Sequence, residues 1–365
     1  RLLPPAVTRS FCLLLLTAIA SPTQADEQDD ARRLIDDSGV RAGFFVHLGA
    51  GDGKLTTALR QNESTQVHGL VGRDVDLDQI RERVRASGEG LYGDIAFDRF
   101  AGGELPYVDN MVNLLVAESL DNVSKEEVLR VLVPNGVAMI REGDSWTKVV
   151  KPRPDKIDEW SHYLHDATGN SVAHDDVVAP PRHLQWVGSP RWSRHHDRMA
   201  SMSALVSTGG RMFYIMDEGS RISIQLPPKW KLIARDAFNG SVLWKKDIAD
   251  WQPHLWPLKS GPTQLSRRLV SNEEEVYVTL GFNAPLSALD AATGEVLRTY
   301  ADSDATEEII STGDMLYLVV RKGKAELADY APLFGTVGDQ ARSRSFFWNE
   351  EPRVVMAFQA STGKQ

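Results

Sequence analysis

The chain has 365 residues, of which 42% are apolar and 25% are charged, an ordinary composition for a soluble globular protein and enough length for two domains. Its net charge of −9 argues against nucleic acid as a partner, because phosphate backbones attract basic surfaces. The single cysteine, Cys12, lies in the first segment. If that segment is removed, disulfides, thiolate metal sites and a cysteine nucleophile are excluded.

Residues 1–25 have the pattern of a secretory signal. Arg1 and Arg9 flank the start of an apolar run that ends near Ala20, and Ala25 stands at the expected cleavage position. We expect removal of this segment, a periplasmic or cell-envelope location, and no transmembrane span after cleavage. A retained membrane anchor or a buried helix is the alternative.

A strand, a glycine turn and a helix follow one another early in the chain. Phe44–Leu48 is a short apolar strand, Gly49, Gly51 and Gly53 lie in the turn, and Lys54–Arg60 is predicted to be helical. Glycines allow the backbone to approach a ligand closely. An ordinary strand-to-helix loop would give the same pattern.

Further strands and helices alternate over residues 31–143. Val67–Val71 is followed by Asp74, which lies 21 residues beyond Gly53, close to the spacing at which an acid reaches ribose hydroxyls. Asp94 is expected to end a third strand, and Met111–Ala117 forms a fourth. This alternation predicts an α/β domain with a mostly parallel, doubly wound sheet and a ligand at the carboxyl ends of its strands.

The order of these motifs, up to about Glu142, resembles that of class I S-adenosylmethionine-dependent methyltransferases. The resemblance implies that the glycine turn holds the methionine end of S-adenosylmethionine, that Asp74 binds the ribose and that Asp94 contacts the adenine. Two positions depart from the family. His47 stands where the first motif has an acid, and Asn113 stands where an Asp faces the active site; neither neutral side chain offers a negative charge.

Residues 144–200 form a His- and Trp-rich linker, which holds six of the nine histidines. Imidazole and carboxylate groups together suit a divalent cation. The candidate ligands, for a metal whose identity the residues leave open, are His162, His165, Asp166, His174 and Asp175. The alternative is a polar, aromatic loop that packs one module on the other.

Residues 201–365 change to strand periodicity and contain a repeat. Apolar runs at 211–216, 275–280 and 315–320 are predicted strands. Three similar turns place glycines at 240, 294 and 363, where a positive φ is expected. The repeat resembles that of pyrroloquinoline quinone enzymes and their non-catalytic relatives, which implies the first blades of a β-propeller, with Trp244 docking between blades and Arg298 in the equivalent place of the second copy.

The chain begins with Arg1 and ends at Gln365 inside a repeat, so we expect a longer protein whose further blades complete the ring. Quinoprotein dehydrogenases use a vicinal disulfide, a catalytic Asp and calcium. After removal of residues 1–25 the chain has no cysteine, and its blades contain no matching cluster of acids, so pyrroloquinoline quinone is not an expected cofactor. The whole fusion resembles exported proteins of planctomycete-type bacteria.

Three functions follow from these features. The first is an exported binding or scaffold protein, whose propeller binds an unidentified protein or small molecule. The second is an active S-adenosylmethionine-dependent methyltransferase. The third is a quinone- or metal-dependent oxidoreductase that uses the His-rich segment.

Overall fold

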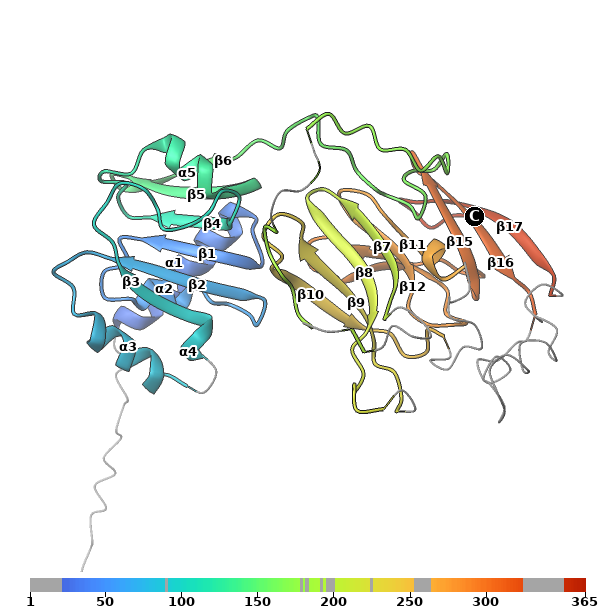
Figure 1. The fold of residues 1–365 in the computed structure, drawn as a ribbon, viewed down its shortest axis with the longest axis horizontal. Helices are drawn as coiled ribbons and strands as arrows, with labels where there is room; N and C mark the ends of the chain where they lie inside the picture. The colour runs from blue at the N-terminus through green and yellow to red at the C-terminus, as the bar shows by residue number, and fades with distance from the viewer. Residues whose placement is uncertain are drawn as a thin grey trace, which may run out of the picture.

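An α/β module is followed by three antiparallel sheets in the computed structural model (Figure 1). The structure describes residues 22–88, 91–177, 180, 184–190, 193–194, 201–223, 226–252, 264–323 and 351–365. Most of the expected signal segment and three of the linker histidines, His183, His195 and His196, lie outside these residues.

The first module is built on a six-stranded sheet with the order β3-β2-β1-β4-β5-β6, in which all neighbours are parallel except β5 and β6. Its strands are β1 (Gly43–Leu48), β2 (Thr65–Val71), β3 (Ile95–Arg99), β4 (Val112–Ala117), β5 (Leu132–Glu142) and β6 (Ser145–Val150). Its helices are α1 (Pro22–Ser38), α2 (Lys54–Ala58), α3 (Leu77–Ala86), α4 (Leu91–Asp94) and α5 (Lys125–Val131). The doubly wound α/β prediction is confirmed.

Both faces of this sheet are covered because its central strands are apolar throughout. Every residue of β4 is buried. Leu114 packs with α1 and α2 on one face, whereas Leu115 packs with α5 on the other, as the alternation of side chains along a strand requires. A ligand or the second module can therefore reach the sheet at the ends of its strands but not at its faces. The side where the strands β1 to β5 begin is the amino edge, and the side where they end is the carboxyl edge.

The module extends beyond the predicted boundaries of 31 and 143. Helix α1 begins at Pro22, and its Leu34 and Ile35 are buried in the core. At the other end, β6 adds a hairpin strand to β5. The third strand was expected to end at Asp94, which is wrong: Asp94 precedes β3, which runs from Ile95 to Arg99.

The second module contains three consecutive antiparallel sheets, in which neighbouring strands follow one another along the chain. The first holds β7 (Met202–Thr208), β8 (Arg211–Asp217), β9 (Trp230–Asp236) and β10 (Val242–Asp247). A 3₁₀ turn, Leu265–Arg268, leads into β11 (Leu269–Ser271), β12 (Glu275–Thr279), β13 (Leu286–Asp290) and β14 (Val296–Thr299). The third sheet holds β15 (Thr306–Thr312), β16 (Met315–Arg321) and β17 (Arg353–Gln359).

An aromatic side chain from each of the first two sheets docks on the repeated turn of the next. Trp244 of β10 donates its indole N–H to the carbonyl of Ala291 at 3.1 Å and covers Gly294. Tyr300, after β14, donates its hydroxyl to Ala360 at 2.7 Å. The contact expected of Trp244 is confirmed, while Arg298 pairs with Glu275 and leaves the docking to Tyr300.

Trp186, in the joint, makes the same contact with the first sheet, because it donates its indole N–H to Ala237 at 3.2 Å and lies over Gly240. Two of these equivalent contacts thus stack the three sheets in one direction, and the third places the joint on the first sheet. No closed ring is formed by the described residues, and the propeller stays a proposal.

Gly294→Ala tests this docking contact. Gly294 has φ of +74°, and a Cβ there would lie 2.6 Å from the Trp244 ring. Gly313 is the matched control, since it also has a positive φ but a Cβ there meets no atom within 4 Å. We expect Gly313→Ala to lower the unfolding free energy of the second module by about 1–2 kcal/mol, and Gly294→Ala to lower it by about 3–4 kcal/mol, because the clash adds to the backbone cost. Equal losses in urea unfolding would show that Trp244 does not hold the next sheet.

Candidate functional site

The glycine turn lies where the strand order reverses, between β1 and β4. In doubly wound sheets this is the point at which ligands bind, beyond the carboxyl ends of the strands. Gly51 has φ of +49°, and a Cβ built on it meets nothing closer than the carbonyl oxygen of Gly49, at 3.9 Å. Gly53, by contrast, is closed in, because a Cβ there would lie 2.8 Å from Ile80. The backbone at Gly51 is therefore open to solvent, whereas that at Gly53 is not.

Asp74 follows β2, the neighbour of β1, and its side chain is exposed. Because β1 and β2 are parallel, their carboxyl ends share one edge of the sheet. The structure thus places Asp74 on the same edge as Gly49, Gly51 and Gly53, as the sequence predicted.

Asp94 lies on the opposite edge, at the amino end of β3. Its carboxylate pairs with Arg60, in the connection between α2 and β2, at 2.7 Å. The expected contact of Asp94 with adenine does not fit this position, because Asp94 and the glycine turn lie at opposite ends of parallel strands. The residues directly before Asp94 belong to α4, and β3 begins after it.

Two charged residues at the glycine edge were missed from the sequence. Glu118 directly follows β4, and its Cβ is the nearest atom to a Cβ built on Gly49, at 3.4 Å. Its carboxylate accepts a hydrogen bond from Arg141 of β5 at 2.8 Å. Glu118 and Arg141 each follow an apolar run that predicts a strand. A charged residue directly after such a run could have identified them as residues of the carboxyl edge.

His47 points into the module and not toward the edge. It is 2% exposed, and its Nδ1 lies 2.8 Å from the hydroxyl of Thr56 in α2. Burial lowers the pKa of His47 to about 4, so the ring is neutral at pH 7. The residue at the family's acid position is therefore a core residue of this module.

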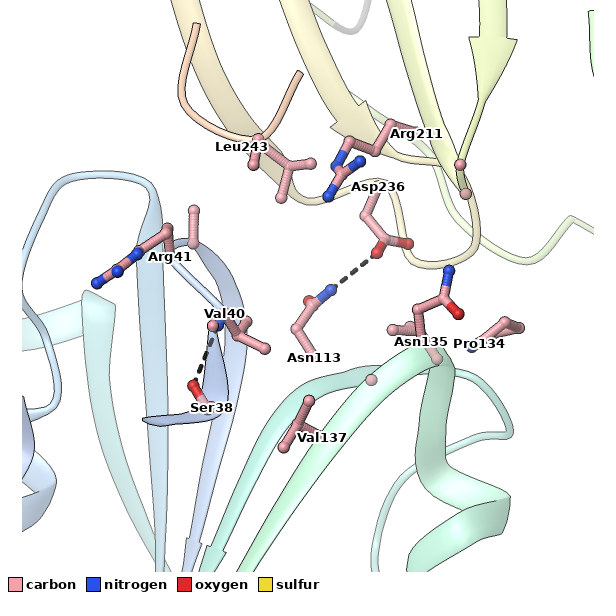
Figure 2. A pocket seen from close by; sticks show the side chains of 17 residues that line it. Ser38, Val40, Arg41, Asn113, Pro134, Asn135, Val137, Arg211, Asp236 and Leu243 are labelled. Atoms are coloured by element: carbon pink, nitrogen blue, oxygen red, sulfur yellow. Dashed lines mark hydrogen bonds between the residues drawn. The ribbon is translucent and has the colours of Figure 1, made fainter. Parts of the chain in front are cut away.

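Asn113 lies at the amino end of β4, on the edge opposite the glycine turn, so the expectation that it faces the active site is wrong. Its side-chain oxygen accepts hydrogen bonds from the backbone N–H of Phe44 at 2.9 Å and from the amide of Asn239 at 2.8 Å. Its own amide donates to Asp236 at 2.8 Å (Figure 2). Asn113 thus joins the sheet to the first repeated turn of the second module.

A cavity of about 160 Å³ accompanies this contact between the modules. It is lined by residues from the amino ends of β1, β4 and β5 and by Arg211, Asp236 and Leu243 of the second module (Figure 2). Burial raises the pKa of Asp236, although hydrogen bonds from Asn239, Phe238 and Asn113 oppose the shift. The second module therefore docks on the amino edge and leaves the glycine turn on the other side of the sheet.

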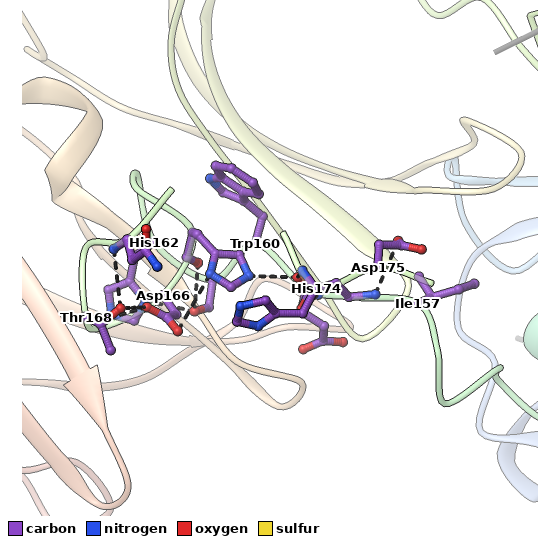
Figure 3. Close-up of polar contacts among 12 residues, drawn as sticks. Ile157, Trp160, His162, Asp166, Thr168, His174 and Asp175 are labelled. Atoms are coloured by element: carbon purple, nitrogen blue, oxygen red, sulfur yellow. Dashed lines mark hydrogen bonds and ion pairs between the residues drawn. The ribbon is translucent and has the colours of Figure 1, made fainter. Parts of the chain in front are cut away.

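Only some of the candidate metal residues lie together (Figure 3). His165 and His174 lie together with Asp158, which was not among the expected ligands. His162 does not join them, since its Nε2 accepts a hydrogen bond from the backbone of Ser311 at 3.0 Å. Asp166 faces Nδ1 of His165 at 3.6 Å, and Asp175 accepts from the backbone N–H of Asp158 at 3.3 Å.

No family model matches the chain, and no curated protein matches its sequence. Solved structures resemble the first module. A methyltransferase that depends on S-adenosylmethionine, from Aquifex aeolicus, is 18% identical over 34% of this chain and 72% of its own, with a TM-score of 0.29. The geranyl diphosphate C-methyltransferase from Streptomyces coelicolor, solved with S-adenosyl-L-homocysteine, is 16% identical over 31% and 43%, with a TM-score of 0.28. The cyclase SpnF is 22% identical over 32% and 47%, also at 0.28.

The chain spans about half the length of several of these structures. Likenesses at such identities and TM-scores do not extend to activity, and the fold rests on the strand order above. Among the described residues, no helix has both the length and the apolar character that crossing a membrane requires.

The buried histidines predict a pH dependence of stability. Burial lowers the pKa of both His47 and His162 from 6.5 to about 4. Between these values the unfolded chain binds more protons, so the stability is complete above about pH 6.5 and is lost as the pH falls toward 4. His47→Gln should reduce the slope of unfolding free energy against pH by up to about 1.4 kcal/mol per unit in that window. If urea unfolding gives the same slope of free energy against pH for the variant and the wild-type chain, the ring of His47 is in contact with water and its pKa is not lowered by burial.

Asn113→Ala tests the junction of the modules. The change removes the acceptor of the Phe44 N–H and the amide that donates to Oδ2 of Asp236, whose other oxygen keeps its backbone hydrogen bonds. We therefore expect a loss of about 2–4 kcal/mol in unfolding free energy and faster proteolytic cleavage between the modules. Asn122→Ala, at an exposed amide of the same module, is the control and should change neither the unfolding free energy nor the rate of cleavage. Similar results for both variants would show that the Asn113 network does not join the modules.

Proposed function

We propose that the first module binds S-adenosylmethionine at the carboxyl edge of its sheet and is a methyltransferase-type domain. The observation that carries the proposal is the glycine turn at the reversal of strand order, with open space at Gly51 and the carboxylate of Asp74 on the neighbouring strand. Close backbone approach suits the methionine end of the cofactor, and an exposed acid one strand away suits the ribose hydroxyls.

The charges at this edge fit the same ligand. The methionine end of S-adenosylmethionine carries an ammonium and a carboxylate. Glu118, beside Gly49, is paired with Arg141, so the edge offers one group of each sign. If Glu118 bound the ammonium and Arg141 bound the carboxylate, each of the four charges would still have a partner of opposite sign.

Neither departure from the family pattern weakens this proposal. His47 is packed against Thr56, and Asn113 lies at the opposite edge. Neither residue faces the ligand, and Glu118 supplies negative charge beside the glycine turn. A methyl acceptor is not identified by these residues, so the proposal extends to the cofactor and the reaction class.

The second module supports a different role. Its sheets stack through Trp186, Trp244 and Tyr300, as blades of a propeller would, and we infer that it serves as a binding or scaffold module. Export through residues 1–25 and a periplasmic or envelope location belong to the same proposal and rest on the sequence pattern alone.

Calorimetric titration of the full chain with S-adenosylmethionine tests cofactor binding. Asp74→Asn should weaken binding about tenfold, since it removes a charged hydrogen-bond acceptor. Asp94→Asn, on the other edge, should bind like the wild-type chain.

Gly51→Ala should also weaken binding at least about tenfold, because its methyl group would enter the space left for the cofactor. Gly39→Ala is its control, with φ of +77° and no atom within 4 Å of a built Cβ. Absence of heat at about 1 mM cofactor, or equal affinities in the Asp74 and Asp94 variants, would reject the proposed site.

A further inference from the structure

One segment of the joint crosses the first strands of all three antiparallel sheets. Trp160 exchanges two backbone hydrogen bonds of 2.8 Å with Ser207, near the end of β7. The carbonyl of the next residue accepts from Ser271 of β11 at 3.1 Å. His162 then accepts from Ser311, near the end of β15. The segment is thus fixed over the carboxyl ends of β7, β11 and β15.

His162 is occupied by this role. Its Nε2 lone pair is taken by the N–H of Ser311, so in the neutral ring the proton lies on Nδ1, which is 2.8 Å from the hydroxyl of Ser161. Neither nitrogen has a lone pair to offer an ion.

The chain then turns back, which brings a second histidine inward. His165 has φ of +75°, and its carbonyl accepts from the N–H of His162 at 3.1 Å. The His165 side chain is 5% exposed, and its Nε2 lies 2.8 Å from Oδ2 of Asp158. The ring of His174 lies 5.4 Å from that of His165. One ligand atom from each of Asp158, His165 and His174 lies within 4.8 Å of the other two.

We propose that Asp158, His165 and His174 bind one divalent transition-metal ion of the zinc type. Two imidazoles and one carboxylate are ligands that such ions accept, and three protein ligands leave a coordination position open. Ligand atoms in a tetrahedral site are about 3.4 Å apart, so only small side-chain movements are needed. His174 is on the exposed side, so the open position faces solvent.

The surroundings fit an ion in this place. Asp166 faces the other ring nitrogen of His165 at 3.6 Å, the position of the outer carboxylate that commonly orients a metal-bound histidine. The ring of Trp160 contacts His165 edge-on, with 5.2 Å between centroids. The carboxylate of Asp158 is held in place by the backbone, since it accepts hydrogen bonds from the N–H of His174 at 2.6 Å and from the N–H of Glu159 at 2.8 Å.

Zinc titration of the full chain, produced without a histidine tag, tests the site. We expect one Zn²⁺ per chain, a zinc-dependent rise in melting temperature, and at least a tenfold loss of affinity in His174→Ala and in Asp158→Asn. Because the side chain of His174 is exposed, His174→Ala should fold normally and keep the wild-type melting temperature in the absence of metal.

Two controls separate the site from general binding by the segment. His162→Gln removes the imidazole but offers an amide oxygen that can still accept from the N–H of Ser311, and Asp176→Asn removes an exposed acid of the same segment. Both should bind Zn²⁺ with the wild-type affinity. No binding at about 1 mM Zn²⁺, or wild-type affinity in His174→Ala, would show that the cluster is held by its hydrogen bonds alone.

Discussion

The side chain of Asn113 is the contact on which the arrangement of the whole molecule depends. One amide group satisfies a backbone donor of β1, a side chain of the second module and the buried carboxylate of Asp236. Because Asn113 lies at the amino end of β4, one of the two central strands, this contact fixes the second module against the amino edge of the sheet. The carboxyl edge, with the glycine turn, is left as the edge at which a ligand can bind.

The same contact explains a buried carboxylate. Burial of a carboxylate is costly unless hydrogen bonds replace the water it loses. Asp236 accepts from the backbone N–H groups of Phe238 and Asn239 at 2.8 and 3.0 Å, in the turn that the other repeats also use. Asp290 makes the equivalent bonds in the second repeat. The acid is therefore needed by its own turn, and Asn113 makes use of an acceptor that the repeat already provides.

The sequence predicted what depends on local chemistry. Apolar runs located β1, β2, β4 and the second strand of each antiparallel sheet, and the glycines marked positive φ at three repeated turns. The position of β3 along the chain was predicted wrongly, because α4 and β3 are both short and Asp94, the last residue of α4, resembled the end of a strand. Contacts between distant segments were not predictable either. Tyr300 stands two residues beyond the expected docking position, and Asn113 acquires its role only from a turn more than a hundred residues further along.

The His-rich segment shows the same distinction between composition and placement. Its composition indicated a cluster, but residues three apart, such as His162 and His165, share a face only where the chain is helical. In the structure these residues belong to a turn, and the backbone bond between them directs one ring toward β15 and the other toward Asp158. That turn is held by the ends of β7 and β11 as well. The geometry of the three proposed ligands thus requires the antiparallel sheets to be assembled side by side. An ion bound there would favour the assembled state over any state in which the sheets are apart, because only the assembled state brings the ligands together.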